Sequence, residues 1–112
     1  MLHAWETSNK NVTDAVLREL RDLTSLAFLN LSGCTLVTDV GVRELHELTT
    51  LITLGLHGCT HVTDVGIQHL SSLTKLTHLY LDPRHRIHDT RTTQAGRNAL
   101  KAALPTLTIH FY

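Results

Sequence analysis

Leucines recur along this chain in a pattern that returns every 25 residues. The pattern consists of Leu23, Leu26, Leu29 and Leu31, then Leu48, Leu51, Leu54 and Leu56, then Leu73, Leu76, Leu79 and Leu81. A repeat of this length is typical of architectures in which each unit covers the apolar face of its neighbour. The spacing therefore predicts a stack of similar units rather than one core assembled from unrelated segments.

Each unit contains two different hydrophobic spacings. Around Leu29 and Leu31 apolar and polar residues alternate, which indicates a half-buried strand. Over residues 37–45 the apolar positions fall at Val37, Val40 and Leu45, closer to the helical period. Ser32-Gly33-Cys34-Thr35 turns the chain between the two. The sequence thus predicts an α/β fold, with a parallel sheet on one side and helices on the other.

Short polar motifs mark where the helices begin. Val12-Thr13-Asp14, Val37-Thr38-Asp39, Val62-Thr63-Asp64 and Ile87-His88-Asp89 follow the same 25-residue step. Thr38 is placed to cap a helix with its hydroxyl, and Asp39 follows in the first turn, where the helix dipole favours negative charge. We expect Gly41 and Gly66 to let each helix start approach the adjoining strand turn closely.

The repeated motif reads LxxLxLxxCxx(V/I)TDxGxxxL, complete in residues 26–45 and 51–70, partial in 76–100 and half present before residue 20. It resembles the cysteine-containing subclass of leucine-rich repeat proteins. The resemblance implies a right-handed solenoid, a short horseshoe with strands on the concave face and helices on the convex face. It also implies that Cys34 and Cys59 point inward, with thiols that satisfy backbone groups of the next turn.

In that family the subclass serves as the substrate-binding arm of F-box ubiquitin ligase receptors, and related members act as adaptors or assembly factors. Residues before the repeats hold no F-box. The resemblance therefore implies a protein–protein interaction module with a substrate-recognition or adaptor role, without the ligase-docking element.

We expect a single domain over residues 1–112, divided into three parts. Residues 1–22 form an N-terminal partial repeat and cap, without an LxxLxL strand in residues 1–9. Three alternatives are open for this end: Trp5 covers the core as a lid, a partner covers it, or upstream repeats were lost. Residues 23–72 form two full repeats, and 73–112 a divergent repeat and cap. In this last part about five extra residues precede Gly96, a helix runs through Leu100 and Ala103, and a final strand includes Leu107 and Ile109.

If the leucines of each strand point inward, the residues between them form rows across the outer face of the sheet. The rows expected are Phe28-Thr53-His78-Thr106, Asn30-Gly55-Tyr80-Thr108 and Ser32-His57-Asp82-His110. Neighbours in a row stand about 4.8 Å apart. The predicted partner-binding residues are Phe28, Asn30, Ser32, Thr53, His57, His78, Tyr80, Asp82, Arg84, Arg86 and His110. Cleft-facing His57 and His78 further suggest a pH-sensitive contact.

Two other interpretations remain open for parts of this surface. Residues 82–91 replace the expected cysteine turn with a basic, histidine-bearing segment, which is either a terminal cap or a recognition loop. The row Ser32, His57, Asp82 and His110 has the residue types of a hydrolytic or metal site. A shallow sheet lacks an oxyanion site and a water-excluding pocket, so we expect no enzyme, metal or cofactor. A structural or designed repeat fragment without a ligand is the remaining alternative.

Charge and composition narrow the kinds of partner. Residues 1–72 carry four basic and eight acidic side chains (−4), and residues 73–112 carry six basic and two acidic ones (+4). This dipole lacks the broad basic face of a nucleic-acid-binding protein. No signal peptide or membrane-spanning run is apparent, and two cysteines within the repeat suit a reducing compartment. We expect a cytoplasmic protein with a protein partner, no nucleic acid, no membrane, and association of copies through the end strands as a further option.

Overall fold

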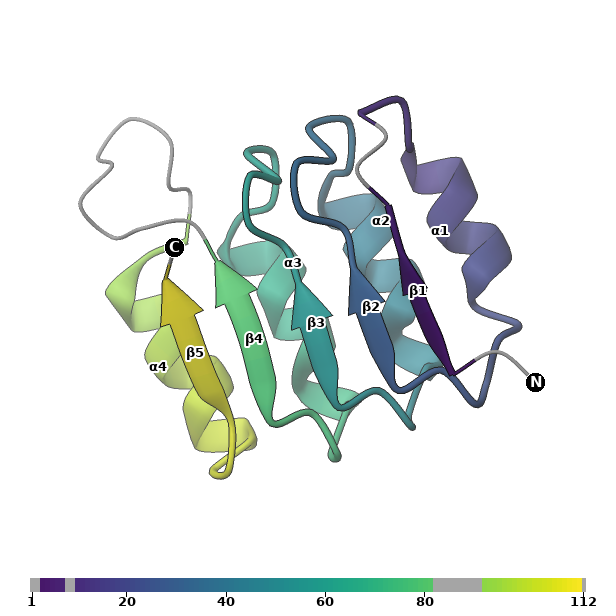
Figure 1. The fold of residues 1–112 in the computed structure, drawn as a ribbon. Helices are drawn as coiled ribbons and strands as arrows, with labels where there is room; N and C mark the ends of the chain where they lie inside the picture. The colour runs from purple at the N-terminus through teal and green to yellow at the C-terminus, as the bar shows by residue number, and fades with distance from the viewer. Residues whose placement is uncertain (1–2, 8–9, 82–91, 112) are drawn as a thin grey trace.

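The computed structural model describes residues 3–7, 10–81 and 92–111. The elements are β1 (Ala4–Glu6), α1 (Asp14–Leu20), β2 (Phe28–Asn30), α2 (Asp39–Arg43), β3 (Thr53–Gly55), α3 (Asp64–Gln68), β4 (His78–Leu81), α4 (Gln94–Ala103) and β5 (Thr108–Phe111). Short 3₁₀ helices, Glu44–Glu47 and His69–Ser72, extend α2 and α3. The fold is α/β, with one five-stranded parallel sheet in the order β1-β2-β3-β4-β5 and the helices on one of its faces (Figure 1).

The central strands lie side by side at the 25-residue step. Phe28 pairs with Thr53, and Thr53 pairs with His78, so that Leu29, Leu54 and Leu79 form one inward row. β2 and β3 are each followed by a turn and a helix that returns the chain to the start of the next strand, as a parallel pair requires. The predicted alignment of the strand residues of the three leucine-rich units is confirmed.

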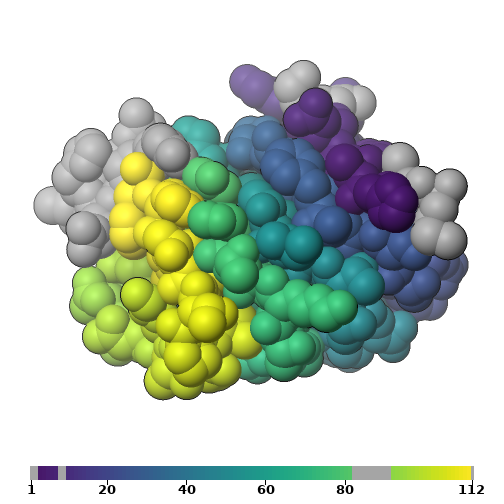
Figure 2. Space-filling view, turned by 60° about the horizontal axis from the view of Figure 1, so that its bottom comes forward, coloured from purple at the N-terminus to yellow at the C-terminus, as the bar shows by residue number. Residues whose placement is uncertain are grey.

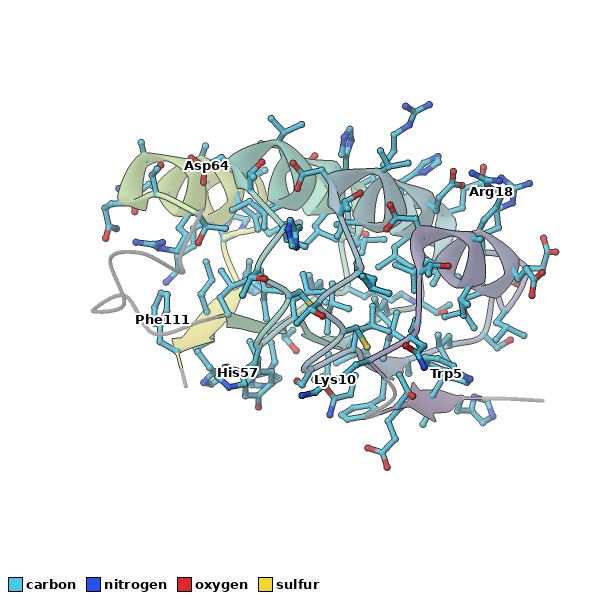
Figure 3. All side chains as sticks on the ribbon, turned by 90° about the horizontal axis from the view of Figure 1, so that it is seen from above. Trp5, Lys10, Arg18, His57, Asp64 and Phe111 are labelled. Atoms are coloured by element: carbon cyan, nitrogen blue, oxygen red, sulfur yellow. The ribbon has the colours of Figure 1, made fainter. Side chains whose placement is uncertain are left out.

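The core lies between the sheet and the helices, seen end-on in Figure 3. Leucines of all three copies of the motif are fully buried there, together with Val42 and Ile67 from the helices. Val40, expected on the apolar face of its helix, is 54% exposed, and Val42 takes the buried place instead. Because α2 has only five residues before the 3₁₀ turn, its inner face is set by Gly41, Val42 and Leu45 rather than by a long helical stripe.

A strand forms near the N-terminus, where the sequence analysis expected none. In β1, Trp5 pairs with Leu29, and Glu6 pairs with Asn30. Trp5 is half-buried and packs against the core, which agrees with its expected role as a lid. β1 forms although it has only three residues and one inward aromatic side chain, because the neighbouring strand β2 offers backbone groups for pairing.

The register of the last strand differs from the expected rows by two residues. Thr108 pairs with His78, and His110 pairs with Tyr80. The cause is the role of Leu107: its amide donates to the carbonyl of Leu104 at 3.0 Å, as the Leu76 amide does to Leu73 at 2.9 Å. Leu107 therefore belongs to the turn before the strand, and Ile109 takes the place expected for Leu107. Thr106 accordingly lies outside the row of Phe28, Thr53 and His78.

Successive helices are joined by an aspartate of one unit and a threonine of the next. The carboxylate of Asp14 accepts from the amide and the hydroxyl of Thr38, at 2.8 and 2.5 Å. Asp39 binds Thr63 in the same way, at 2.7 and 2.5 Å. The hydroxyls of Thr38 and Thr63 also accept from the amides of Val40 and Val65, as expected of N-caps. We call each of these arrangements an Asp–Thr joint.

The glycines of the helix starts belong to these joints, not to the strand turns. A Cβ at Gly41 would overlap the carboxylate of Asp14, and one at Gly66 would overlap that of Asp39. The third joint lies between Asp64 and Thr93, at 2.7 and 2.6 Å. Thr93 is thus the counterpart of Thr63, so the 25-residue step does not continue to Ile87-His88-Asp89, which lies outside the described residues. The five extra residues before Gly96 are confirmed by the 29-residue separation of Asp64 and Thr93, against 24 in the other two joints.

Cys34 and Cys59 are buried and free of disulfide bonds. The thiol of Cys59 donates to the carbonyl of Leu31 at 3.1 Å, in the preceding unit rather than the next one. Among the described residues no helix has both the length and the apolar character that a membrane span requires.

Candidate functional site

The face of the sheet turned away from the helices, here called the open face, carries a shallow hollow at its centre. Its volume is about 340 Å³. We call it the central groove, and its lining consists of Phe28, Asn30, Ser32, Thr53, Gly55, His57 and Tyr80. These residues come from β2, β3, β4 and the turns that follow β2 and β3. In Figure 3, His57 lies on the sheet side of the molecule and Asp64 lies on the helix side.

The floor of the groove depends on Gly55 in the central strand β3. A Cβ on Gly55 would overlap the side-chain oxygen of Asn30 and come within 3.3 Å of the hydroxyl of Ser32. The Asn30 oxygen also accepts from the amide of Ser32 at 3.0 Å, which fixes the side chain over the floor. A strand glycine often marks a place where another group approaches the backbone closely. Here the missing side chain opens the centre of the sheet face.

Aromatic side chains stand at both sides of this floor. Phe28 on β2 is 37% exposed, and Tyr80 on β4 is half-buried. The Tyr80 ring stacks on the ring of His110, with centroids 4.5 Å apart and planes 16° apart. Aromatic rings with little rotamer freedom provide contact area at small entropic cost. Tyr80 therefore forms a preorganised wall.

Two histidines meet beside that wall. Nδ1 of His78 lies 3.0 Å from Nε2 of His110, a hydrogen bond in which one nitrogen donates and the other accepts. Their ring centroids are 5.2 Å apart. Figure 2 shows the strands that carry the two residues, β4 and β5, as adjacent green and yellow bands of the surface.

The predicted catalytic or metal row of Ser32, His57, Asp82 and His110 is wrong at His110. His110 pairs with Tyr80, so it does not continue the row of Ser32 and His57. Asp82 lies outside the described residues, as do Arg84 and Arg86. Ser32 and His57 belong to neighbouring turns, which are tied by the amide of Gly33 donating to the His57 carbonyl at 2.7 Å. The described residues contain no group of three or more His, Cys, Asp or Glu that could hold a metal ion.

The structure thus brings most of the predicted partner-binding residues together. The central groove includes the predicted residues Phe28, Asn30, Ser32, Thr53, His57 and Tyr80. Residues 4–6 were missed, and with them Glu6, which pairs with Asn30 and lines a second hollow of about 420 Å³ with Thr7, Asn30 and Ser32. No repeat signal in residues 1–9 could have revealed this part of the face.

Comparison with known proteins gives no assignment. No protein-family model matches the chain, and a search of the curated proteins found no match.

Proposed function

We propose that this chain is a protein–protein interaction module that binds its partner through the open face. The observation that carries the proposal is the central groove, a hollow on the sheet face that is lined by side chains from three successive units. Rigid scaffolds commonly present binding residues in this way. The groove, with a volume of about 340 Å³, lies at the lower end of the size range of small-molecule pockets. Because it is shallow and open, it also suits one or two side chains of a partner.

The chemistry of the lining favours a polypeptide partner. Aromatic Phe28 and Tyr80 flank the polar groups of Asn30, Ser32 and Thr53. Protein interfaces combine aromatic anchors in hollows with hydrogen-bonding groups around them. The described residues of the open face have the same composition, and among them there is no charge excess of the kind that a nucleic-acid site requires.

We further propose that the chain is a leucine-rich repeat solenoid of the cysteine-containing subclass. Three features support this assignment. They are the two complete copies of the motif, the parallel strands aligned at the 25-residue step, and the hydrogen bond from the buried Cys59 thiol to a neighbouring unit. If the assignment holds, the open face is the concave face of a short horseshoe. A substrate-recognition or adaptor role, inside the cell, follows from the same resemblance.

A site-specific cross-linking experiment tests the proposed binding face. A photoreactive phenylalanine analogue replaces Thr53 in the central groove, and in a matched control it replaces Val65, which is 64% exposed on α3. We expect a discrete cross-linked protein in cell extract from position 53 only. The Phe28→Ala/His57→Ala/Tyr80→Ala variant should lose this product while keeping the wild-type unfolding midpoint.

Two results would contradict the proposal. Equal cross-linking from positions 53 and 65 would mean that the contacts are not specific to the open face. No product from any open-face position would favour a structural repeat fragment without a ligand. The second candidate is a metal or hydrolytic site on the row of Ser32, His57, Asp82 and His110. The metal version loses support because His110 is displaced from that row, and Asp82, which the hydrolytic version requires, lies outside the described residues.

A further inference from the structure

We propose that His78 and His110 form a binding site for a single divalent transition-metal ion at the edge of the open face. The site is distinct from the row of Ser32 and His57, and it does not depend on the function proposed above. It rests on the β4–β5 register, which brings two imidazole nitrogens from adjacent strands to 3.0 Å.

The distance between the two nitrogens suits a shared metal ion. Imidazole nitrogens bind such metals at about 2.0–2.1 Å, so two of them in adjacent positions of a square-planar or octahedral ion lie about 2.9 Å apart. In a tetrahedral ion they lie about 3.3 Å apart. The observed 3.0 Å falls between these values. A metal ion can therefore replace the shared proton once both rings have turned by roughly 35–45°, so that their lone pairs converge on one point instead of facing each other. The χ2 torsion of histidine is broad enough to allow such a turn.

The surroundings hold the two residues close together. Both residues lie within paired strands of one sheet, so their Cα positions are fixed by the ladder. The Tyr80 ring stacks on His110 at 4.5 Å and restricts its orientation. His78 is exposed, which leaves the remaining coordination positions to water or to a side chain of a partner. Ligands on rigid elements lose less entropy when they bind than ligands on loops.

Donor chemistry predicts the order of metals. Two imidazoles favour copper over nickel and zinc, in line with the general affinity order of first-row ions. Binding requires neutral imidazoles, so protons compete with the metal, and affinity should fall as the solution is acidified.

Isothermal titration with Ni²⁺ and Zn²⁺ near neutral pH tests the site, in a His3→Asn background that removes an exposed imidazole outside it. We expect one-site binding in this background and a loss of affinity of about tenfold or more with His78→Asn or His110→Asn. His46→Asn, remote on the 3₁₀ helix after α2, is the matched control and should change nothing. Cu²⁺ should broaden NMR signals around His78, Tyr80 and His110 first.

The His57→Asn variant distinguishes this site from the row of Ser32 and His57 that the sequence predicts. Unchanged binding in His57→Asn supports the His78–His110 site. Loss of binding in His57→Asn but not in His78→Asn would overturn it. Equal isotherms for all variants, in proteins with unchanged circular dichroism and unfolding midpoints, would also overturn it, because the heat would then come from scattered surface histidines.

Discussion

Cys34 is a buried thiol whose ionisation the fold opposes. The side chain has no solvent exposure, and burial raises the pKa of the Cys34 thiol above its ordinary value. A raised pKa means that the folded state favours the protonated, uncharged thiol. The thiol is therefore a structural group of the core and not a nucleophile.

This environment predicts alkaline sensitivity. The unfolded chain ionises Cys34 once the pH passes about 8.5, while the folded chain still holds the proton, so stability is full below that pH and falls as pH rises. Urea unfolding at about pH 7.5 and about pH 10 should show a larger loss of unfolding free energy in the wild type than in Cys34→Ala. An equal loss in both proteins would assign the alkaline effect to other groups. Slow alkylation of both cysteines in the folded protein, and rapid alkylation in urea, provides an independent check.

Individual groove residues were predictable because a strand exposes every second side chain. Once Leu29 and Leu54 were assigned to the core, Phe28 and Thr53 had to face the other side. The role of Gly55 was less accessible, since the hollow exists only because the Asn30 side chain lies over the neighbouring strand. That contact depends on a rotamer, which alternation alone does not specify.

At the level of the elements, the Asp–Thr joints fix how each helix sits against the next. Each aspartate accepts two hydrogen bonds from the following unit, and a glycine of that unit makes room for its carboxylate. Hydrogen bonds to a charged acceptor are stronger than neutral ones. The joints therefore couple neighbouring units in the helix layer, as the strand ladder does in the sheet.

Removal of the central joint should destabilise the protein measurably. We expect Asp39→Ala to lower the unfolding free energy by about 2 kcal/mol, because Thr63 loses both bonds to the carboxylate. Asp22→Ala, an exposed aspartate outside the joints, should stay within about 0.5 kcal/mol. Chemical denaturation of both variants provides the measurement. A cost for Asp39→Ala as small as that of Asp22→Ala would contradict the coupling.

The neighbouring glycine allows a stricter test of the same joint. Gly66→Ala should also destabilise the protein, because the new Cβ overlaps the Asp39 carboxylate. In the Asp39→Ala/Gly66→Ala double variant the overlap disappears, so the combined cost should be smaller than the sum of the two single costs. Additive costs would mean that Gly66 acts through a different contact, such as the one with Val62.

The strands β2, β3 and β4 were predictable in position and partner, whereas the edge strands were not. β1 has one inward side chain, Trp5, and three residues carry too little alternation to be recognised. For β5 the predicted alternation of inward and outward residues was correct, but the predicted register was not. One residue lies between Leu107 and Ile109, whereas two lie between the corresponding leucines of the earlier units. A period-two pattern cannot distinguish registers that differ by two residues.

For the whole molecule, the two ends of the stack differ from its interior in the residues that form the joints. At the N-terminal end, Val16 occupies the position of Gly41 and Gly66. At the C-terminal end, Gln94 occupies the position of Asp39 and Asp64, and the buried Arg97 takes the place of Val42 and Ile67. The Arg97 guanidinium donates to the carbonyl and hydroxyl of Thr92 and lies 5.2 Å from the Phe111 ring centroid. The N-terminal end thus lacks the glycine of a joint, and the C-terminal end lacks the aspartate.

These differences predict that the helix layer opposes stacking of one copy on another. Among the described elements, the end strands β1 and β5 then remain as a route for association of copies. Val16→Gly/Gln94→Asp restores both halves, so this double variant should self-associate more than the wild type in sedimentation velocity over a wide concentration range. Each single variant restores only one half and should behave like the wild type. Equal association of all four proteins would show that the joints do not govern the ends.

The order and number of the central units were the most predictable features of the molecule, since they follow from a repeat in the sequence. Segments 1–9 and 82–91 interrupt that repeat. The corrections to the expected architecture concern the strand β1, the register of β5, the buried position on α2, the acceptor of the Cys59 thiol and the joints. The joints themselves combine residues about one unit apart, such as Asp14 and Thr38. Their hydrogen bonds cannot be deduced from a motif that is read one unit at a time.

The third Asp–Thr joint has a practical consequence for protein engineering. Asp64 and Thr93 meet as closely as their counterparts although five more residues separate them. Doubling the length of a flexible connection costs only about 0.6 kcal/mol in closure entropy. Foreign peptides inserted between Leu81 and Thr92 should therefore leave the third joint and the scaffold intact, so that one chain can carry both its own fold and an added sequence.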